Sequence, residues 1–366
     1  MSLPPLTLRD VTLRPVIVPL KRPLVTRILT IENIALLLID VHTEEGVTGR
    51  AYLWGFTPRG CGYLAGLIED IVASCAGDAI VPERLFAKAR KGLTMLGHQG
   101  MTLTAISGFD MACWDALAQA AGQPLATLLG GRTDPIAAYN STGLGIIDAD
   151  AAADEALELL ADGGFAAVKI RLGREDFAAD LAALRAVRRA VGDDILLPCD
   201  FNQCLDLAEA LKRGRSLDDE GVYWIEEPIV YDDFTGCAEL ASAVTTPIQI
   251  GENFYGPEDL ARALATGACD YVMPDAQRIG GVTGWMRAAG LAEAAGVPMS
   301  SHLFPEFSRH LLAATPTAHW LEYVDWASPV LAEPAIVENG HLPIPATPGA
   351  GITWNEDAVS KYTVDY

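Results

Sequence analysis

Eight short apolar segments between residues 136 and 323 constrain the fold of this chain more than any other feature. They read IAAYNS, FAAVKIRLG, ILLPCDFN, YWIEEP, PIQIGEN, YVMPDA, PMSSH and HWLEY. Most are separated by amphipathic stretches rich in alanine and leucine, each long enough for one helix. Eight strands that are each followed by a helix are the sequence pattern of a (β/α)8 barrel. We therefore predict an α/β fold built on a TIM-type barrel.

The residues before the barrel read as strands followed by helices. Two apolar runs, LTLRDVTLRPVIVPL and IALLLIDVHTEEGVTGRAYL, look like antiparallel strands joined by a loop, KRPLVTRILTIEN. Amphipathic stretches follow near 62–76, 83–95 and 100–122. This order predicts an α+β capping domain, on which a tail rich in Pro and Gly is expected to pack. The predicted division is a capping domain over 1–132, a barrel over 133–330 and a C-terminal segment over 331–366.

The charge balance excludes several classes of partner. The formal net charge is −22, from 26 basic and 48 acidic residues, and such a surface repels phosphate backbones and anionic lipid. The apolar runs fall short of the roughly 20 residues that span a bilayer, and the N-terminus lacks the pattern of a secretion signal. Seven cysteines without C-x-x-C spacing fit a reducing compartment. We predict a cytoplasmic protein that binds neither nucleic acid nor membrane.

Polar side chains gather where the predicted strands end. In such a barrel the active site lies at the C-terminal ends of the strands. Lys169 and Arg171, two positions apart, share one face of their strand. A ring of structural ion pairs would explain any one polar residue, but burying many charges together without a function is costly. The other strand ends supply Asp200, Asn202, Glu226, Glu252, Asp275, His302 and Glu322.

Three of these carboxylates predict a metal site. Asp200, Glu226 and Glu252 end consecutive strands at equal intervals in the sequence. Three carboxylates in one small pocket repel one another unless a cation offsets their charge. Ligation by oxygen alone suits Mg²⁺, whereas zinc usually recruits His or Cys. Glu227, next to Glu226, must point to the opposite face and is predicted to be structural.

Asp275 and His302 predict a base. They end adjacent strands, about 4.8 Å apart, so the carboxylate can hydrogen-bond one imidazole nitrogen and raise the basicity of the ring. Glu322, crowded among acids, is expected to be protonated and to donate a hydrogen bond to a substrate carboxylate. The metal, Lys169 and Glu322 would then stabilise the enediolate that forms when a proton α to a carboxylate is removed.

The sequence also resembles the enolase superfamily, and within it the mandelate racemase subgroup, which includes proteins like muconate lactonizing enzyme. The resemblance is strongest in VGDDILLPCDFNQ, GVYWIEEP, GENFYGPEDL, MPDAQRIGGVTGW and PMSSHLFPEFSRHLLAATPTAHWLE. It implies a homo-oligomer, octameric in assembly, and substrate contacts from Ser141 and Asn202. It also implies that Arg278 lies near the metal ligands. By position it implies Mg²⁺ ligands at Asp200, Glu226 and Glu252, a catalytic Asp275–His302 pair, an electrophilic acid at Glu322 and the first lysine of K-x-K at Lys169.

Arg171 departs from that family pattern. The subgroup has a catalytic second lysine in K-x-K, whereas this chain reads KIR. Lysine beside other cations can lose its proton near neutral pH, but arginine almost never does. Two-base racemisation is therefore less expected than β-elimination of water with His302 as the base.

Two segments of the capping domain are expected, by the resemblance, to close over the barrel mouth. LVTRILTI and LWGFTP bring mainly apolar side chains, which suit an aryl or alkyl substituent better than a polyol. Arg27 is an exception: if its side chain pointed into the barrel mouth, it would bind a second carboxylate of the substrate. Packing of the lobe against the barrel would explain these residues equally well. The apolar candidates are Leu24, Ile28, Ile31, Trp54 and Phe56.

The sequence thus predicts an enzyme that uses Mg²⁺ to abstract the proton α to a carboxylate through an enediolate. Its substrate would be a small carboxylate, either a 2-hydroxy acid or a sugar acid. The reaction would be that of a mandelate racemase-like racemase or that of an acid-sugar dehydratase. The alternative is a non-catalytic relative that keeps carboxylate affinity as a binding or scaffold protein and has lost turnover.

Overall fold

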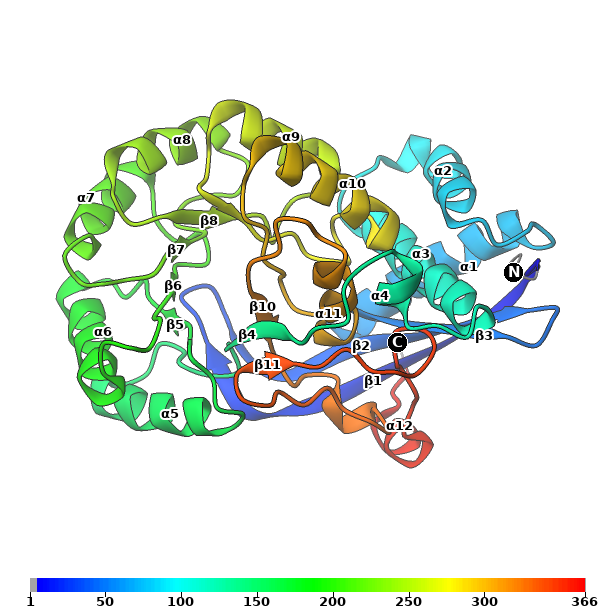
Figure 1. Ribbon diagram of the computed structural model, residues 1–366, viewed down its shortest axis with the longest axis horizontal. Helices are drawn as coiled ribbons and strands as arrows, with labels where there is room; N and C mark the ends of the chain where they lie inside the picture. Colours follow the sequence, from blue (N-terminus) through cyan, green and yellow to red (C-terminus); the bar gives the residue numbers. More distant parts are fainter. Residues whose placement is uncertain (1–4, 366) are drawn as a thin grey trace.

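The computed structural model describes residues 5–365, and its central part is a closed barrel (Figure 1). Strands β5 to β9 pair in parallel in chain order, and β10 pairs in parallel with β4. A parallel bridge between Asn140 and Val168 joins β4 to the segment that leads into β5. The predicted barrel is confirmed. Its strands are β4 Ile136–Asn140, β5 Ile170–Arg171, β6 Cys199–Asp200, β7 Ile225–Glu226, β8 Ile248–Ile250, β9 Tyr271–Val272 and β10 Leu321–Tyr323.

The segment 298–302 occupies the seventh place in the barrel through single bridges rather than a continuous strand. Ser300 donates its N–H to a carbonyl of β9, and Met299 donates in the other direction, to the segment that leads into β10. Pro298, at the start of this stretch, lacks the N–H that a regular ladder needs. The segment still closes the ring, and it pairs His302 with Asp275.

Helices follow the barrel strands and cover the outside of the barrel (Figure 1). Asp176, Asp206 and Asp233 each accept a hydrogen bond from the first turn of the helix that they precede, so these helix starts are encoded locally. Among the described residues, no helix has both the length and the apolarity needed to cross a bilayer. The helices are α5 Ala149–Ala161, α6 Phe177–Val191, α7 Leu207–Leu217, α8 Phe234–Ala243, α9 Pro257–Thr266, α10 Gly281–Ala295 and α11 Pro305–Ala313.

The elements before the barrel, β1 to α4, form what we call the capping lobe. Its antiparallel sheet has the order β1–β2–β3, and α3 packs on β3. Gly49 permits this close packing, because a Cβ there would lie only 2.0 Å from the carbonyl oxygen of Ala112. The strands are β1 Leu8–Val25, β2 Thr30–Thr43 and β3 Thr48–Trp54, and the helices are α1 Pro58–Cys75, α2 Pro82–Gly92, η1 Thr94–Leu96, α3 Met101–Ala120 and α4 Leu125–Leu128.

The loop expected over KRPLVTRILTIEN is wrong. β1 and β2 continue through most of it as a hairpin, in which Leu24 pairs with Ile31. Only Thr26 to Leu29 turn, and the Thr26 hydroxyl accepts the N–H of Leu29. A register shift between Pro19 and Leu24 lets the strands resume pairing beyond the proline, so the hairpin carries its tip to the barrel mouth.

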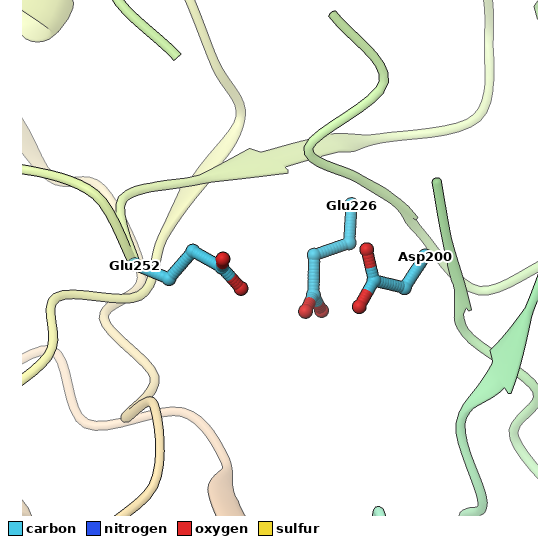
Figure 2. A group of neighbouring side chains, drawn as sticks. All are labelled: Asp200, Glu226 and Glu252. Atoms are coloured by element: carbon cyan, nitrogen blue, oxygen red, sulfur yellow. The ribbon is translucent and has the colours of Figure 1, made fainter. Parts of the chain in front are cut away.

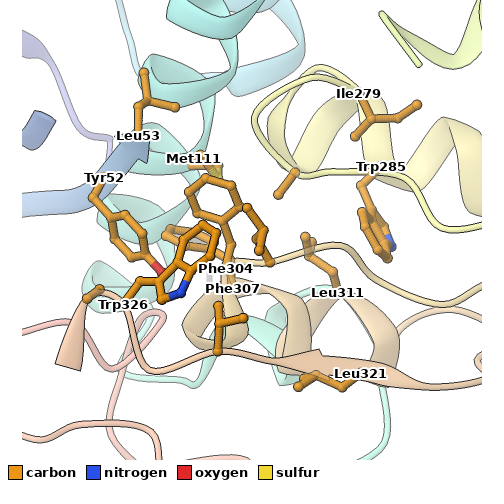
Figure 3. Packing of buried hydrophobic residues seen from close by; sticks show 14 of the residues in the cluster. Tyr52, Leu53, Met111, Ile279, Trp285, Phe304, Phe307, Leu311, Leu321 and Trp326 are labelled. Atoms are coloured by element: carbon orange, nitrogen blue, oxygen red, sulfur yellow. The ribbon is translucent and has the colours of Figure 1, made fainter. Parts of the chain in front are cut away.

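Apolar packing is continuous between the capping lobe and the barrel (Figure 3). Tyr52 and Leu53 of β3 and Met111 of α3 belong to the same buried cluster as Phe307 and Leu311 of α11. Burial of this shared surface holds the two parts together, because removal of apolar area from water is the main favourable term in folding.

The residues after β10 lie against both parts of the fold. They contain η2 Ser328–Val330, β11 His341–Leu342 and α12 Glu356–Tyr362. β11 pairs antiparallel with β4, and α12 contacts β1. The indole N–H of Trp354 donates to Asp40 of β2 at 2.8 Å.

Candidate active site

A cavity of about 200 Å³ lies between the barrel mouth and the capping lobe. Most of the site residues that the sequence predicts line it, whereas Ser141, Glu226 and Asp275 lie behind its wall. Sequence reasoning missed several lining residues, although Gln203, Asn253 and Leu303 directly follow predicted site residues. The lining residues are Leu24, Thr26, Ile28, Leu29, Ile31, Trp54, Phe56, Lys169, Arg171, Asp200, Asn202, Gln203, Glu252, Asn253, Arg278, His302, Leu303, Glu322 and Trp326.

Asp200, Glu226 and Glu252 bring one oxygen each to within 4.8 Å of one another (Figure 2). Asp200 is fixed by the backbone and side-chain N–H groups of Asn202, at 2.8 and 3.0 Å. The indole N–H of Trp224 donates to Glu226 from the barrel interior at 3.0 Å. Asp200 and Glu226 are therefore oriented before any ion binds.

The chemistry of these three groups fits a hard divalent cation. All of the donors are carboxylate oxygens, which Mg²⁺ prefers. Burial raises the pKa of Glu226, and repulsion from Asp200 and Glu252 adds to this effect against the attraction of Lys169. A cation held by the trio would relieve that repulsion. Glu227 instead accepts the N–H of Gly251 at 2.9 Å, in keeping with a structural role.

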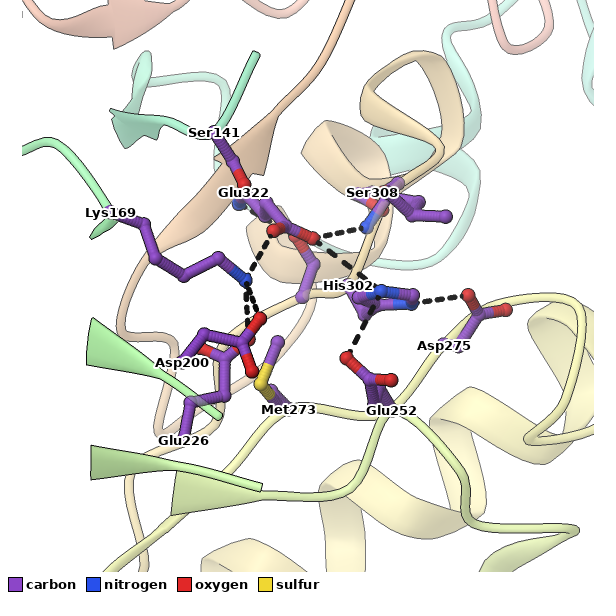
Figure 4. A network of polar contacts seen from close by, with 12 residues as sticks. Ser141, Lys169, Asp200, Glu226, Glu252, Met273, Asp275, His302, Ser308 and Glu322 are labelled. Carbon is purple, nitrogen blue, oxygen red and sulfur yellow. Dashed lines mark hydrogen bonds and ion pairs between the residues drawn. The ribbon is translucent and has the colours of Figure 1, made fainter. Parts of the chain in front are cut away.

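Lys169 lies among the carboxylates at the centre of the mouth (Figure 4). Its ammonium group contacts Glu226 and lies 3.2 Å from Asp200 and 2.8 Å from Glu322. Burial opposes its charge, but the attraction of these three neighbours outweighs burial and raises its pKa. Lys169 is thus a fixed cation rather than a proton acceptor.

His302 and Asp275 form the predicted pair. Nδ1 of His302 lies 2.6 Å from Asp275, and Nε2 lies 3.3 Å from Glu252 on the cavity side (Figure 4). Burial alone would lower the pKa of His302, but Glu252, Glu322 and the hydrogen-bonded Asp275 raise it to about 9. A cation held by Glu252 would cancel part of that effect, so the imidazole would lose its proton more easily in the metal-bound protein.

The expectation that Glu322 is protonated is wrong. Burial favours its neutral form, but the positive charge of Lys169 and of protonated His302 outweighs burial and lowers its pKa. The N–H of Leu303 also donates to this carboxylate at 3.0 Å. The prediction considered only the neighbouring acids, whereas the positive charges of Lys169 and His302 have the larger effect on the pKa of Glu322.

Arg171 lines the cavity, but its guanidinium is hydrogen-bonded to residues outside the cavity lining. Its two terminal nitrogens donate to the carbonyl of Gly143 at 2.7 Å and to the hydroxyl of Ser141 at 3.0 Å. Its Nε has no hydrogen-bond partner among residues 5–365. The Ser141 hydroxyl therefore binds the guanidinium, and Ser141 does not line the cavity.

Left-handed backbone conformations gather at the ends of the barrel strands. Asn202, Gln203, Glu227, Leu303 and Phe304 all have positive φ, between 40° and 63°. Such conformations are unfavourable for side chains other than glycine and persist where the surroundings enforce them. Here they turn the chain sharply after a functional side chain has been placed.

The capping lobe and the residues after β10 together supply an aromatic wall. The rings of Trp54 and Phe56 stack at 3.9 Å, and Trp326 meets Trp54 edge-on at 5.1 Å. The Arg278 guanidinium lies 5.8 Å from the Phe56 ring and donates to the Glu252 carbonyl, so the wall reaches the metal ligands. Arg27 does not point inward; it pairs with Glu175 on the surface at 2.9 Å.

Two family models match the chain. Residues 8–130 match the mandelate racemase/muconate lactonizing enzyme N-terminal domain, and residues 151–358 match the enolase C-terminal domain-like family. Among curated proteins, the L-talarate/galactarate dehydratase of Salmonella typhimurium is 31% identical over 329 residues, which are 89% of this chain and 82% of that protein.

Solved structures extend this similarity. An enolase from the alpha-proteobacterium bal199 with bound Mg is 50% identical, with a TM-score of 0.96 over 98% of this chain and 100% of that chain. An enolase from Bradyrhizobium complexed with magnesium and mandelic acid is 44% identical, with a TM-score of 0.94 over 99% and 100% of the two chains. An L-talarate dehydratase from Polaromonas sp. JS666 complexed with Mg and L-glucarate is 30% identical, with a TM-score of 0.88 over 98% and 97%.

Proposed function

The chain belongs to the mandelate racemase/muconate lactonizing enzyme family of the enolase superfamily, and we propose that His302 is the base with which it removes the proton α to a substrate carboxylate. The protein is a Mg²⁺-dependent enzyme acting on small acids, in line with the dehydratases, cycloisomerases and epimerases among its relatives. This sets aside the alternative of a non-catalytic scaffold.

The observation that carries the proposal is the position of His302. Its Nδ1 is occupied by Asp275, so Nε2 is left facing the cavity. Asp200, Glu226 and Glu252 would hold Mg²⁺, which supplies a Lewis acid for the substrate carboxylate. Lys169 would add a second positive charge to the same carboxylate. As the α-proton leaves, negative charge grows on those oxygens, where fixed cations stabilise it best.

We further propose that the net reaction is dehydration. The α C–H bond breaks and its proton moves to Nε2 of His302, while the electron pair passes into the enediolate. That pair then expels a hydroxide from the β-carbon, and His302 returns its proton so that water leaves. The enol that remains rearranges to a 2-keto acid. Arg171 supports this outcome, because a guanidinium tied to Gly143 and Ser141 does not accept or deliver protons near neutral pH.

A second candidate reaction has support from the aromatic wall. Trp54, Phe56 and Trp326 would pack against an aryl substituent, and the Bradyrhizobium relative is complexed with mandelic acid. With one base, an aryl 2-hydroxy acid without a leaving group would exchange the α-hydrogen of one enantiomer but would racemise slowly.

The Arg171→Lys variant tests the one-base proposal. We expect the wild type to exchange the α-hydrogen of one enantiomer with D₂O, and the lysine variant to raise exchange of the other enantiomer roughly tenfold or more, since a positioned base contributes about 10²–10⁴-fold. The measurement is proton NMR with Mg²⁺ and a panel of both mandelate enantiomers, galactarate and D-gluconate. On galactarate and D-gluconate, formation of a 2-keto acid would report dehydration.

The matched control is Arg174→Lys, because Arg174 binds Asp180 and does not line the cavity. Similar exchange of both enantiomers by the wild type, with no gain in the Arg171→Lys variant, would contradict the one-base assignment.

We propose a homo-oligomer, octameric by similarity to the family, in the cytoplasm. The exposed Met95 and Leu96 of the capping lobe are compatible with an intersubunit contact, because such residues are costly to leave in water. Light scattering at micromolar concentration should report a mass several times that of one chain. A mass of 39.0 kDa, that of one chain, would rule out a stable assembly.

A further inference from the structure

Hydrogen bonds join the capping lobe to residues that lie beside the Asp275–His302 pair. The backbone N–H of Trp54, the last residue of β3, donates to the side-chain oxygen of Gln277 at 2.9 Å. The backbone N–H of Gln277 in turn donates to Oδ1 of Asp275 at 2.7 Å, opposite the oxygen that binds His302. Gln277 is 1% exposed, so water does not replace either contact.

A second hydrogen bond joins β3 to α11, the helix that follows His302. The hydroxyl of Tyr52 donates to Glu306 at 2.5 Å, and both side chains are buried. Glu306 lies in the first turn of α11, which begins directly after Leu303 and Phe304. The Tyr52 ring also packs on Phe304, with ring centroids 5.1 Å apart.

The backbone between these contacts and the base is unusual. Leu303 and Phe304, the two residues after His302, have φ of 50° and 49°. Two successive left-handed residues without glycine need outside contacts to hold them. The bond from Tyr52 to Glu306 is one such contact.

Tyr52 and Trp54 share one face of β3, because they are two positions apart on a strand. Trp54 also lines the cavity through its side chain. β3 thus contributes Trp54 to the cavity lining. The same strand also makes the hydrogen bonds to Gln277 and Glu306, which lie beside the Asp275–His302 pair.

We propose that β3 positions the Asp275–His302 pair from the capping lobe, with Gln277 and the Tyr52–Glu306 hydrogen bond as the positioning groups. This inference rests on the proposed role of His302 as the base. β3 carries Trp54 and is also hydrogen-bonded to Gln277 and Glu306 beside the pair, so a substituent that packs on Trp54 is held at a set distance from His302. A small displacement of the base is expected to be costly, because reacting groups must lie within a narrow range of geometry.

The test uses Gln277→Met, which keeps the side-chain length and removes the acceptor, and Tyr52→Phe, which removes only the hydroxyl. The probe is the acid of the panel above that the wild type exchanges fastest in D₂O. Each variant should lower kcat for exchange roughly 10- to 100-fold with KM within about threefold, since misplacing reacting groups by 1 Å can cost about 10²-fold. Mg²⁺ affinity, measured by calorimetry, should stay unchanged.

A second readout is the kinetic isotope effect on kcat, taken from exchange of the protiated substrate in D₂O and of the α-deuterated substrate in H₂O, with the same pair of solvents for wild type and variants. It should increase in both variants, because slower proton transfer becomes fully rate-limiting. The matched control is Thr283→Val, which breaks a different bond between the lobe and the barrel: Thr283 donates to Asp110 of α3 at 2.6 Å and does not touch the pair. This control should keep kcat within about threefold and leave the isotope effect unchanged.

Wild-type kcat and isotope effect in folded Gln277→Met and Tyr52→Phe would overturn the inference, as would equal losses in Thr283→Val. If the wild type exchanges none of the acids, or if His302→Asn retains exchange, the proposed function fails and the inference fails with it. If His302→Asn is inactive and the two positioning variants behave as wild type, only the inference fails.

Discussion

The His302→Asn variant is expected to lose α-hydrogen exchange by roughly 10³-fold, within the range that a positioned general base contributes. Asparagine can still donate to Asp275 as Nδ1 does, at the 2.6 Å contact seen here, but it offers no basic nitrogen to the cavity. Loss of exchange would therefore reflect loss of the base rather than collapse of the site. The measurement is the exchange of the acid panel in D₂O by proton NMR.

His319→Gln is the matched control for this variant. His319 lies just before β10, at the end of that strand away from Glu322. It is hydrogen-bonded to the Tyr223 hydroxyl and does not line the cavity. Its replacement should leave exchange within about threefold of wild type. Near-normal exchange by His302→Asn would refute the assignment of the base.

Removal of the metal is expected to have an effect of similar size. EDTA should reduce exchange to the background rate, and excess Mg²⁺ should restore it, because the enediolate would lose its main source of positive charge. The Asp200→Asn variant removes one of three charged ligands. It should weaken Mg²⁺ binding in calorimetry by more than about 100-fold, since loss of an outer contact to a ligand alone costs about 10–100-fold.

Asp232→Asn is the control for that measurement, because Asp232 is an exposed carboxylate outside the cavity lining. Its Mg²⁺ affinity should match wild type. Activity that survives EDTA, or a divalent ion bound elsewhere, would count against the assignment of Asp200, Glu226 and Glu252.

The sequence predicts the barrel and the polar residues at its mouth because both follow from local order. In a (β/α)8 fold, the position of a residue at a strand end decides where it points. This is why Asp200, Glu226 and Glu252 meet in space although each lies on a different strand. The Asp275–His302 contact follows in the same way from adjacent strands.

Features set by contacts between distant segments could not be predicted in this way. The ionisation of Glu322 depends on Lys169 and His302, and the orientation of Arg171 depends on carbonyls at Ser141 and Gly143. The hydrogen bond from Trp54 to Gln277 joins residues far apart in the sequence, so no local sequence pattern predicts it. The antiparallel β1–β2 pair was predicted, but its connection is shorter than expected, because strand pairing continues through Leu24 and Ile31 up to the turn.

The contacts of the C-terminal residues bear on how the chain folds during synthesis. Gly349 accepts a hydrogen bond from Leu125, Ala350 donates to Asp115 at 2.6 Å, and Trp354 donates to Asp40. A ribosome releases the capping lobe well before these partners, which follow the whole barrel in the sequence. Asp115 and Asp40 both bind Arg50 within the lobe, and they gain these further partners only after the barrel has been made. The lobe therefore gains some of its stabilising contacts only after the barrel has been made, so nascent chains that stall in the barrel should be unusually sensitive to proteases.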